Sequence, residues 1–274
     1  YRTADGDVGA MRSCGGAPRE ATLERVRDTV ATEQGVDPAE ARMPFRGPHT
    51  VTVPGTARGW EATIDRLGTQ SLADVLAPAI QYATEGYPVT EVIADQWRDW
   101  EHRFTRENAR RAYLKDGLAP RTGEPMVLSE LGESLRTVAE EGADAIYEGT
   151  LGEQIVAEVR DAGGFLSMED LAAHTVEWPD PVSTTYRGAE VFELPPNNQG
   201  LIALEALNIA AEIGAGDHPY DSPERVHALA EAMKLAFHDG HRYISDPEFV
   251  EVPPLASREW ARDRAQRIGD RALT

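Results

Sequence analysis

Two short polar stretches contain residue types that could hold a substrate. The first is Asn197 to Gly200, called the amide turn below, which follows Pro195-Pro196 at the end of a β-rich run. Proline offers no N–H to a sheet ladder, so the strand ends there and the amide side chains form a turn. A strand that stops at a helix N-terminus presents N–H groups and polar side chains at the rim of a sheet. We therefore predict a substrate site next to the side chains of Asn197, Asn198 and Gln199. A plain strand-to-helix connection would use the same residue types.

The second stretch is Met11-Arg-Ser-Cys-Gly-Gly-Ala-Pro18. The forked guanidinium of Arg12 is suited to binding a carboxylate, and Gly15 lets the backbone approach a ligand closely. Cys14 is the one cysteine of the chain, which excludes an internal disulfide and a cysteine-based metal cluster. We predict that Cys14 is a buried structural thiol rather than a reactive one.

A third candidate is His238-Asp-Gly-His241. Two histidines three positions apart on a helix can ligate zinc. Gly240 weakens a helix at this point, and no third ligand is evident nearby in the sequence. We therefore predict no metal site and no cofactor, and we expect Asp239 to stabilise the end of the helix.

The composition excludes several classes of partner. The chain has 274 residues, of which 41% are hydrophobic, enough for a folded core. A formal net charge of −20 and a pI near 4.7 make nucleic acid and anionic membranes poor partners. No apolar run approaches the roughly 20 residues that a membrane span needs. We expect one region covering residues 1–274, incomplete at both ends, because the chain opens within a hairpin. The location stays open, with a cytoplasmic one slightly favoured, because the N-terminus that would carry a targeting signal is expected to be missing.

Helices are predicted on both sides of these stretches. Leu201, Leu204 and Leu207 share one face of a helix that begins directly after the amide turn. Another helix begins at Ser222-Pro223, since proline is favoured at a first helical position. Its apolar positions form one clean stripe, made of Val226, Leu229, Ala230, Met233 and Phe237.

Strands and caps are predicted from shorter patterns. Alternation at Val51 and Val53 indicates a strand, and Arg187-Gly188 is expected to be the turn of a hairpin within the run that ends at Phe192. Asp5-Gly6 is typical of a further hairpin turn. Ser71 and Ser167, each followed three residues later by an aspartate, have the spacing of capping boxes.

Blocks spread over the chain, roughly from Tyr1 to Arg267, resemble the large subunit of γ-glutamyltranspeptidases in the same order. They include Val51-Thr-Val-Pro-Gly55, Glu85-Gly-Tyr-Pro-Val89, Asp144-Ala-Ile-Tyr-Glu-Gly149 and Tyr186-Arg-Gly188. The amide turn is similar to the Pro-Pro-Pro-Ser-Ser-Gly-Gly segment of that family. Its Asn-Asn-Gln-Gly form looks closer to the acylase-like and oxamate-amidohydrolase-like branch.

One block departs from the family pattern. In true γ-glutamyltranspeptidases it resembles Asp-x-Arg-Glu-x-Ala-Pro, and its arginine holds the α-carboxylate of the glutamyl substrate. Aligned on Ala17-Pro18, the position of that arginine holds Cys14, and Arg12 lies two residues earlier, on the same face of an extended segment. The resemblance therefore implies that Cys14, Arg12 and Gly15 mark the substrate-binding position, and that γ-glutamyl specificity is in doubt.

The family implies an N-terminal-nucleophile hydrolase, an α+β fold in which a four-layer αββα sandwich is shared between two subunits of one self-cleaving zymogen. This chain would be the helix-rich large-subunit part. The nucleophile would be an N-terminal threonine beyond the chain, so that no catalytic residue lies within it. The implied partners are the small subunit of the same precursor and a small amide or γ-glutamyl substrate.

Three functions remain open at this point. The first is an amide-bond hydrolase or acyltransferase of the acylase-like branch. The second is a true γ-glutamyltransferase or glutathione hydrolase, which the residue at position 14 argues against. The third is a non-catalytic helical interaction module, which would be favoured if the intact gene carried no threonine nucleophile.

Overall fold

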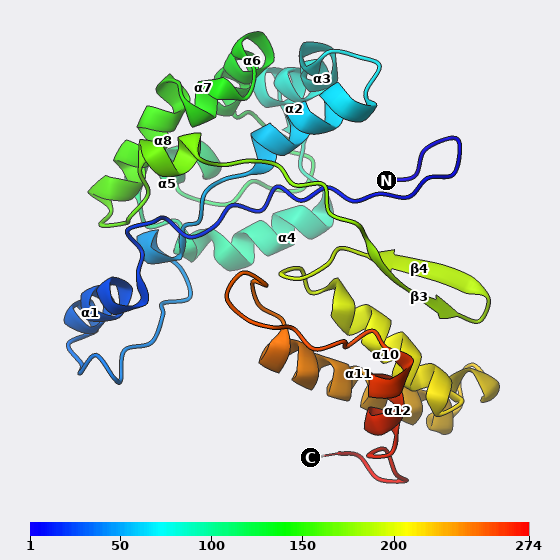
Figure 1. Ribbon diagram of the computed structural model, residues 1–274. Coiled ribbons are helices and arrows are strands. Elements are labelled where there is room, and N and C mark those ends of the chain that lie inside the picture. Colours follow the sequence, from blue (N-terminus) through cyan, green and yellow to red (C-terminus); the bar gives the residue numbers. More distant parts are fainter. Residues whose placement is uncertain (274) are drawn as a thin grey trace. The chain divides into compact units, whose positions relative to one another are not determined.

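The computed structural model describes residues 1–273 (Figure 1). Its contacts divide the chain into two compact units: unit 1 contains Tyr1–Arg12 and Glu177–Thr274, and unit 2 contains Ser13–Val176. Treating residues 1–274 as one functional region stays a prediction. Among residues 1–273, no helix combines the length and apolar character that crossing a bilayer requires.

Unit 2 is mainly helical. Its short strands β1 (Tyr87–Pro88) and β2 (Pro125–Met126) pair antiparallel. The helices are α1 (Leu23–Gln34), α2 (Thr56–Leu67), α3 (Leu72–Glu85), α4 (Glu91–Trp100), α5 (Glu107–Tyr113), α6 (Ser129–Glu141), α7 (Asp144–Tyr147), α8 (Thr150–Asp161) and α9 (Met168–Ala172). Short 3-10 turns occur at Pro48–Thr50 and Glu101–Arg103.

The predicted capping boxes are confirmed at two of these helices. The hydroxyl of Ser71 accepts from the backbone N–H of Asp74, and the carboxylate of Asp74 accepts in return at the start of α3. Ser167 and Asp170 do the same for α9. Each box satisfies N–H groups that have no partner within the helix, which sets where the helix begins.

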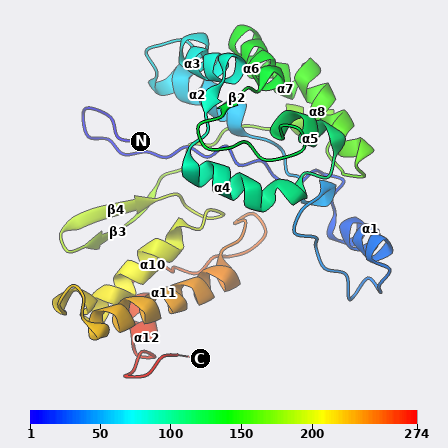
Figure 2. The same cartoon turned by 180° about the vertical axis from the view of Figure 1, so that it is seen from behind.

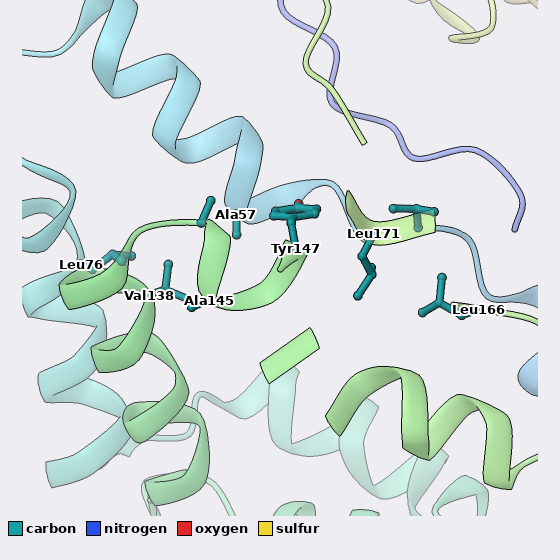
Figure 3. Close-up of a cluster of buried hydrophobic side chains, with 9 residues drawn as sticks. Ala57, Leu76, Val138, Ala145, Tyr147, Leu166 and Leu171 are labelled. Atoms are coloured by element: carbon teal, nitrogen blue, oxygen red, sulfur yellow. The ribbon is translucent and has the colours of Figure 1, made fainter. Parts of the chain in front are cut away.

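The core of unit 2 surrounds the ring of Tyr147, which is fully buried. Figure 3 shows Tyr147 among apolar side chains contributed by different helices. The buried cluster contains Val53, Ala57, Leu76, Val138, Ala143, Ala145, Tyr147, Leu166 and Leu171. The apolar faces of these helices pack in the cluster, and their polar faces point to the surface of unit 2, as expected for amphipathic helices.

Unit 1 consists of a hairpin and a group of helices, seen from both sides in Figures 1 and 2. Strands β3 (Val182–Tyr186) and β4 (Ala189–Glu193) pair antiparallel. Arg187 and Gly188 have positive φ angles of 50° and 86°, as a tight hairpin turn requires, so the predicted turn is confirmed. The helices are α10 (Gly200–Glu212), α11 (Pro223–Tyr243) and α12 (Arg258–Ala265), with a 3-10 turn at Ala215–Asp217.

Helix α10 is the centre of unit 1. Of the predicted apolar face, Leu201 and Leu204 are buried, and Ile209 and Ala210 continue the buried surface. Asn208 is also fully buried. Its Oδ1 accepts from the Thr184 hydroxyl at 2.7 Å, and its Nδ2 donates to the carbonyl of Ala256 at 2.8 Å. A buried amide with both groups satisfied joins α10 to β3 and to the segment before α12.

Two sequence predictions are wrong in detail. The segment of Val51 and Val53 joins no sheet ladder; Val53 instead donates its N–H to the carbonyl of Gly16 at 3.0 Å. Around Asp5-Gly6 the chain does reverse, but only the single bridge Arg2↔Val8 forms rather than two strands. The predicted apolar stripe of α11 is present but lies away from α10: Leu229 and Met233 are each 43% exposed. The buried face of α11 carries small residues together with Leu235, Glu231 and Asp239.

Candidate functional site

Arg12 connects the second polar stretch to the amide turn within unit 1. Its Nη1 donates to the carbonyl of Pro196 at 2.6 Å and approaches Oδ1 of Asn197 at 3.4 Å. Its Nη2 forms an ion pair with Glu177. The backbones of Arg12 and Glu177 also exchange two hydrogen bonds of 2.9 Å. The guanidinium, 16% exposed, therefore fixes the chain where it enters the amide turn.

The amide turn is further ordered by its own groups. The N–H of Asn198 donates to the carbonyl of Pro195 at 3.2 Å, and its Oδ1 accepts from the N–H of Gly200 at 3.0 Å. A Cβ on Gly200 would lie 2.7 Å from the Cβ of Glu193, so a larger residue at the first position of α10 would force the end of β4 to shift. Gln199 precedes the helix and makes no side-chain cap bond. Its amide is thus not used to cap α10.

Also within unit 1, helices α10, α11 and α12 share a buried pair of carboxyl groups. Glu205 on α10 is 0% exposed and Asp239 on α11 is 2% exposed. The indole N–H of Trp260 donates to both, at 3.0 Å to Oε1 of Glu205 and 3.0 Å to Oδ2 of Asp239. Arg264 Nε donates to the same Oδ2 at 2.5 Å. We call these four residues the carboxyl pair cluster.

The two carboxyl groups of this cluster differ in their partners. Asp239 has the ion pair with Arg264, whereas Oε2 of Glu205 is buried without a hydrogen-bond partner. Burial, and next the neighbouring Asp239, raises the pKa of Glu205 to about 9. At neutral pH, Glu205 is therefore protonated, while Asp239 is the carboxyl group that pairs with Arg264. The side chain of Asp239 joins α11 to α12, and its expected role in stabilising the end of α11 stays a prediction.

In unit 2, the stretch after Arg12 is held by a different set of contacts. The hydroxyl of Ser13 donates to the carbonyl of Gly55 at 2.7 Å and lies 3.1 Å from Nε2 of His174. Because the Ser13 proton goes to a carbonyl, Nε2 of His174 is the donor to Ser13. This serine–histidine pair therefore positions the backbone and is not an activated nucleophile.

Tyr147 also contacts the residues that hold this segment in place. Its hydroxyl donates to the carbonyl of Pro54 at 2.7 Å, and its ring stacks on His174 with centroids 5.4 Å apart. Burial raises the pKa of the Tyr147 phenol. Backbone contact is so close that a Cβ on Gly15 would lie 1.9 Å from the carbonyl oxygen of Val53. Gly15 is thus required for packing against the Val53 segment.

The prediction of a buried thiol at Cys14 is wrong, because Cys14 is exposed. In an extended segment, neighbouring side chains point to opposite sides. Ser13 is turned inward to Gly55 and His174, so Cys14 is turned outward. A side chain that points outward in this way is accessible to a ligand.

The structure brings together Arg12 and the amide turn, and it places Cys14 and Gly15 in unit 2. Sequence reasoning missed Glu177, His174 and Glu205. Glu177 and His174 lie far along the chain from their partners, so spacing gives no signal for them. Glu205 lies between Leu204 and Ala206 in an otherwise apolar helix. A single acidic residue in such a helix indicates a buried carboxyl group, so the sequence alone could have pointed to it.

The sequence of the whole chain matches one family model. Residues 1–274 match the model of gamma-glutamyltranspeptidase. The chain belongs to the γ-glutamyltranspeptidase family. The resemblance of the sequence blocks to this family is therefore confirmed.

Members of the γ-glutamyltranspeptidase family with hydrolase and acylase names are similar to this chain. A glutathione hydrolase-like YwrD proenzyme of Bacillus subtilis is 37% identical over 241 residues, 85% of this chain and 45% of that protein. The acylase ACY 1 proenzyme of Pseudomonas sp. strain SE83 is 34% identical, over 97% of this chain and 49% of that protein. The chain spans about half the length of these curated relatives.

Solved structures show the same fold. A cephalosporin acylase from Bacillus halodurans matches with a TM-score of 0.87 and 38% identity, covering 98% of this chain and 50% of that one. The fold of this chain is therefore that of family members with solved structures.

Proposed function

We propose that this chain is the large-subunit part of a self-cleaving amide hydrolase or acyltransferase, and that its substrates are acyl amides. The observation that carries the proposal is the family match over residues 1–274, in a chain spanning about half the length of relatives named proenzymes. The other half would supply an N-terminal threonine. The helix-rich part described here would then form part of a four-layer αββα sandwich.

In the proposed reaction, the threonine hydroxyl attacks the amide carbonyl carbon. The α-amino group of the same threonine takes the hydroxyl proton and later returns it to the leaving amine. Backbone N–H groups stabilise the oxyanion of the tetrahedral intermediate. Water then hydrolyses the acyl ester and regenerates the threonine. An acceptor amine in place of water would give transfer.

The amide turn is proposed to line the substrate site. Its backbone is fixed by Arg12 and Asn198, while the amide of Gln199 makes no side-chain cap bond to α10. Asn197 and Gln199 can then offer donors and acceptors without a net charge, which suits an amide substrate.

Position 14 is proposed to set the substrate class. A thiol cannot supply the charged, bidentate donors with which an arginine binds a carboxylate. Arg12 does not replace that arginine easily, because its guanidinium already binds Glu177 and the carbonyl of Pro196. An acyl group without an α-amino acid end is therefore favoured.

The full-length gene product tests this proposal. We expect self-cleavage into two fragments, followed by hydrolysis of butyryl-p-nitroanilide at least as fast as γ-glutamyl-p-nitroanilide. A Cys14→Arg variant should shift the preference toward the γ-glutamyl compound. A full-length protein that neither cleaves itself nor hydrolyses any p-nitroanilide contradicts the proposal. Strong preference for the γ-glutamyl compound in the unaltered enzyme favours the γ-glutamyltransferase alternative.

A further inference from the structure

Helix α11 is apolar on two opposite faces. The buried face carries several small residues, among them Ala228, Ala232 and Ala236, together with one large apolar residue, Leu235, and two acidic residues. Gly240 continues this face, where a Cβ would lie 2.4 Å from the side chain of Ile202. Small residues allow the two helices to approach closely.

The opposite face, called the outer face of α11 below, carries the large apolar side chains. It consists of Val226, Leu229, Ala230, Met233 and Phe237. Val226 is 61% exposed and Phe237 is 46% exposed. Along the helix the stripe extends over about 16 Å at a rise of about 1.5 Å per residue.

This distribution is that of an interior helix. A surface helix keeps its large apolar residues on the side that faces the core and polar residues on the other side. In α11 most of the large apolar residues, Leu235 excepted, lie on the exposed side, which no helix among residues 1–273 of unit 1 buries. A shallow groove on this side is lined by Ala230, Met233, Lys234, Phe237, His238 and His241. A contiguous apolar surface of this kind marks a protein contact.

Charge argues against a second copy of the chain as the occupant. Each copy carries a formal net charge of −20, so two copies repel one another. Lys234, at the border of the groove, is already paired with Glu231 at 3.0 Å. The outer face therefore offers apolar surface rather than charges that would attract another copy.

We propose that the outer face of α11 is the docking surface for the second half of the precursor, the polypeptide that follows residue 274. This inference rests on the proposed function, since it takes its occupant from the half of the relatives' length that this chain does not span. The occupant presents an apolar stripe that packs over Met233 and Phe237. Removal of this contact would expose about three helical turns of large apolar side chains.

A photo-cross-linking experiment on the full-length protein tests the docking surface. p-Benzoyl-phenylalanine is incorporated in place of Met233, and cross-linked peptides are identified by mass spectrometry. The matched control carries the same probe in place of Glu224, an exposed polar residue of the same helix. We expect Met233 probes to cross-link to peptides beyond residue 274, with yields at least tenfold above the control. Cross-links to residues 13–176, or between two copies, overturn the inference.

A pair of substitutions supplies a second measurement. Met233→Asp should release the second fragment from the first during gel filtration, whereas Met233→Leu should leave the two fragments together. Equal retention by both variants contradicts the docking surface. If the unaltered protein cleaves itself and turns over substrate but the Met233 cross-links fall elsewhere, the docking surface alone is wrong. Cross-links beyond residue 274 without cleavage or turnover would instead refute the proposed function.

Discussion

Replacing Glu205 by glutamine should stabilise unit 1 at alkaline pH and change little at acid pH. The substitution keeps an oxygen that can accept from Trp260, and it places an uncharged amide where Oε2 now lies without a partner. Glutamine cannot ionise. The variant therefore removes the cost of a buried carboxyl group that is forced to lose its proton as the pH rises.

The size of this effect follows from the shift in the pKa of Glu205 from 4.5 to about 9. A carboxyl group with a raised pKa in the folded state stabilises the fold fully below pH 4.5 and loses that contribution as pH rises toward 9. At about 1.4 kcal/mol per pKa unit, the loss is roughly 1 kcal/mol at pH 5 and roughly 5 kcal/mol at pH 8. The stability of Glu205→Gln relative to the unaltered protein should therefore rise by about 4 kcal/mol between these pH values.

Hydrogen exchange of peptides from α10 and α11, followed by mass spectrometry at pH 5, 6, 7 and 8, measures the local free energy of opening. Glu212→Gln is the matched control, because Glu212 lies on the same helix but its carboxylate is partly exposed beside Arg262. The control should show no comparable change with pH. A pH-independent difference for Glu205→Gln, or a loss of stability at pH 8, would refute the assignment of the proton to Glu205.

Further predictions concern the stretch around Cys14. Cys14→Ser should leave turnover of the full-length enzyme within about twofold, because the thiol is not the nucleophile; complete loss of p-nitroanilide hydrolysis in a folded variant contradicts this. Arg12→Ala should speed hydrogen exchange in the amide turn while peptides of unit 2 stay unchanged, and equal exchange in both proteins would show that Arg12 does not order the turn. Gly55→Ala should destabilise unit 2 by about 3 kcal/mol in urea unfolding, because a Cβ would lie 1.6 Å from the Ser13 carbonyl oxygen. Gly16→Ala, where a Cβ meets no atom within 4 Å, is its control, and similar losses in both would count against the clash.

Local patterns were sufficient for much of the fold. The capping boxes of Ser71 and Ser167 depend on residues three apart, and the hairpin at Arg187-Gly188 depends on a turn that only certain residues adopt. Each of these features is complete within a few residues. Sequence reasoning therefore predicted them correctly.

Features that depend on distant partners were not predictable in this way. Periodicity correctly indicated that the stripe of α11 is a continuous apolar surface, but it could not tell which side α10 would cover. Alternation at Val51 and Val53 predicts a strand, although the N–H of Val53 has its partner at Gly16 rather than in a sheet. The tendency of free cysteines to be buried predicts a buried thiol at Cys14, whereas the direction of its neighbour Ser13 decides its exposure.

For the candidate site, the sequence predicted the amide turn and Arg12 as separate features. Their connection through the carbonyl of Pro196 and through Glu177 became visible only in three dimensions. Whether Asn197, Asn198, Gln199, Cys14, Arg12 and Gly15 contact a substrate stays a prediction.

The paired backbones of Arg12 and Glu177 have a topological consequence. The chain leaves unit 1 after Arg12 and rejoins it at Glu177, and these two residues are hydrogen-bonded neighbours. Residues 13–176 therefore begin and end at neighbouring backbone positions, so the stretch that carries Cys14 and Gly15 leaves unit 1 at the point where the chain returns to it. Two main-chain hydrogen bonds of 2.9 Å close this junction, so a change that breaks them would loosen the start and the end of unit 2 together.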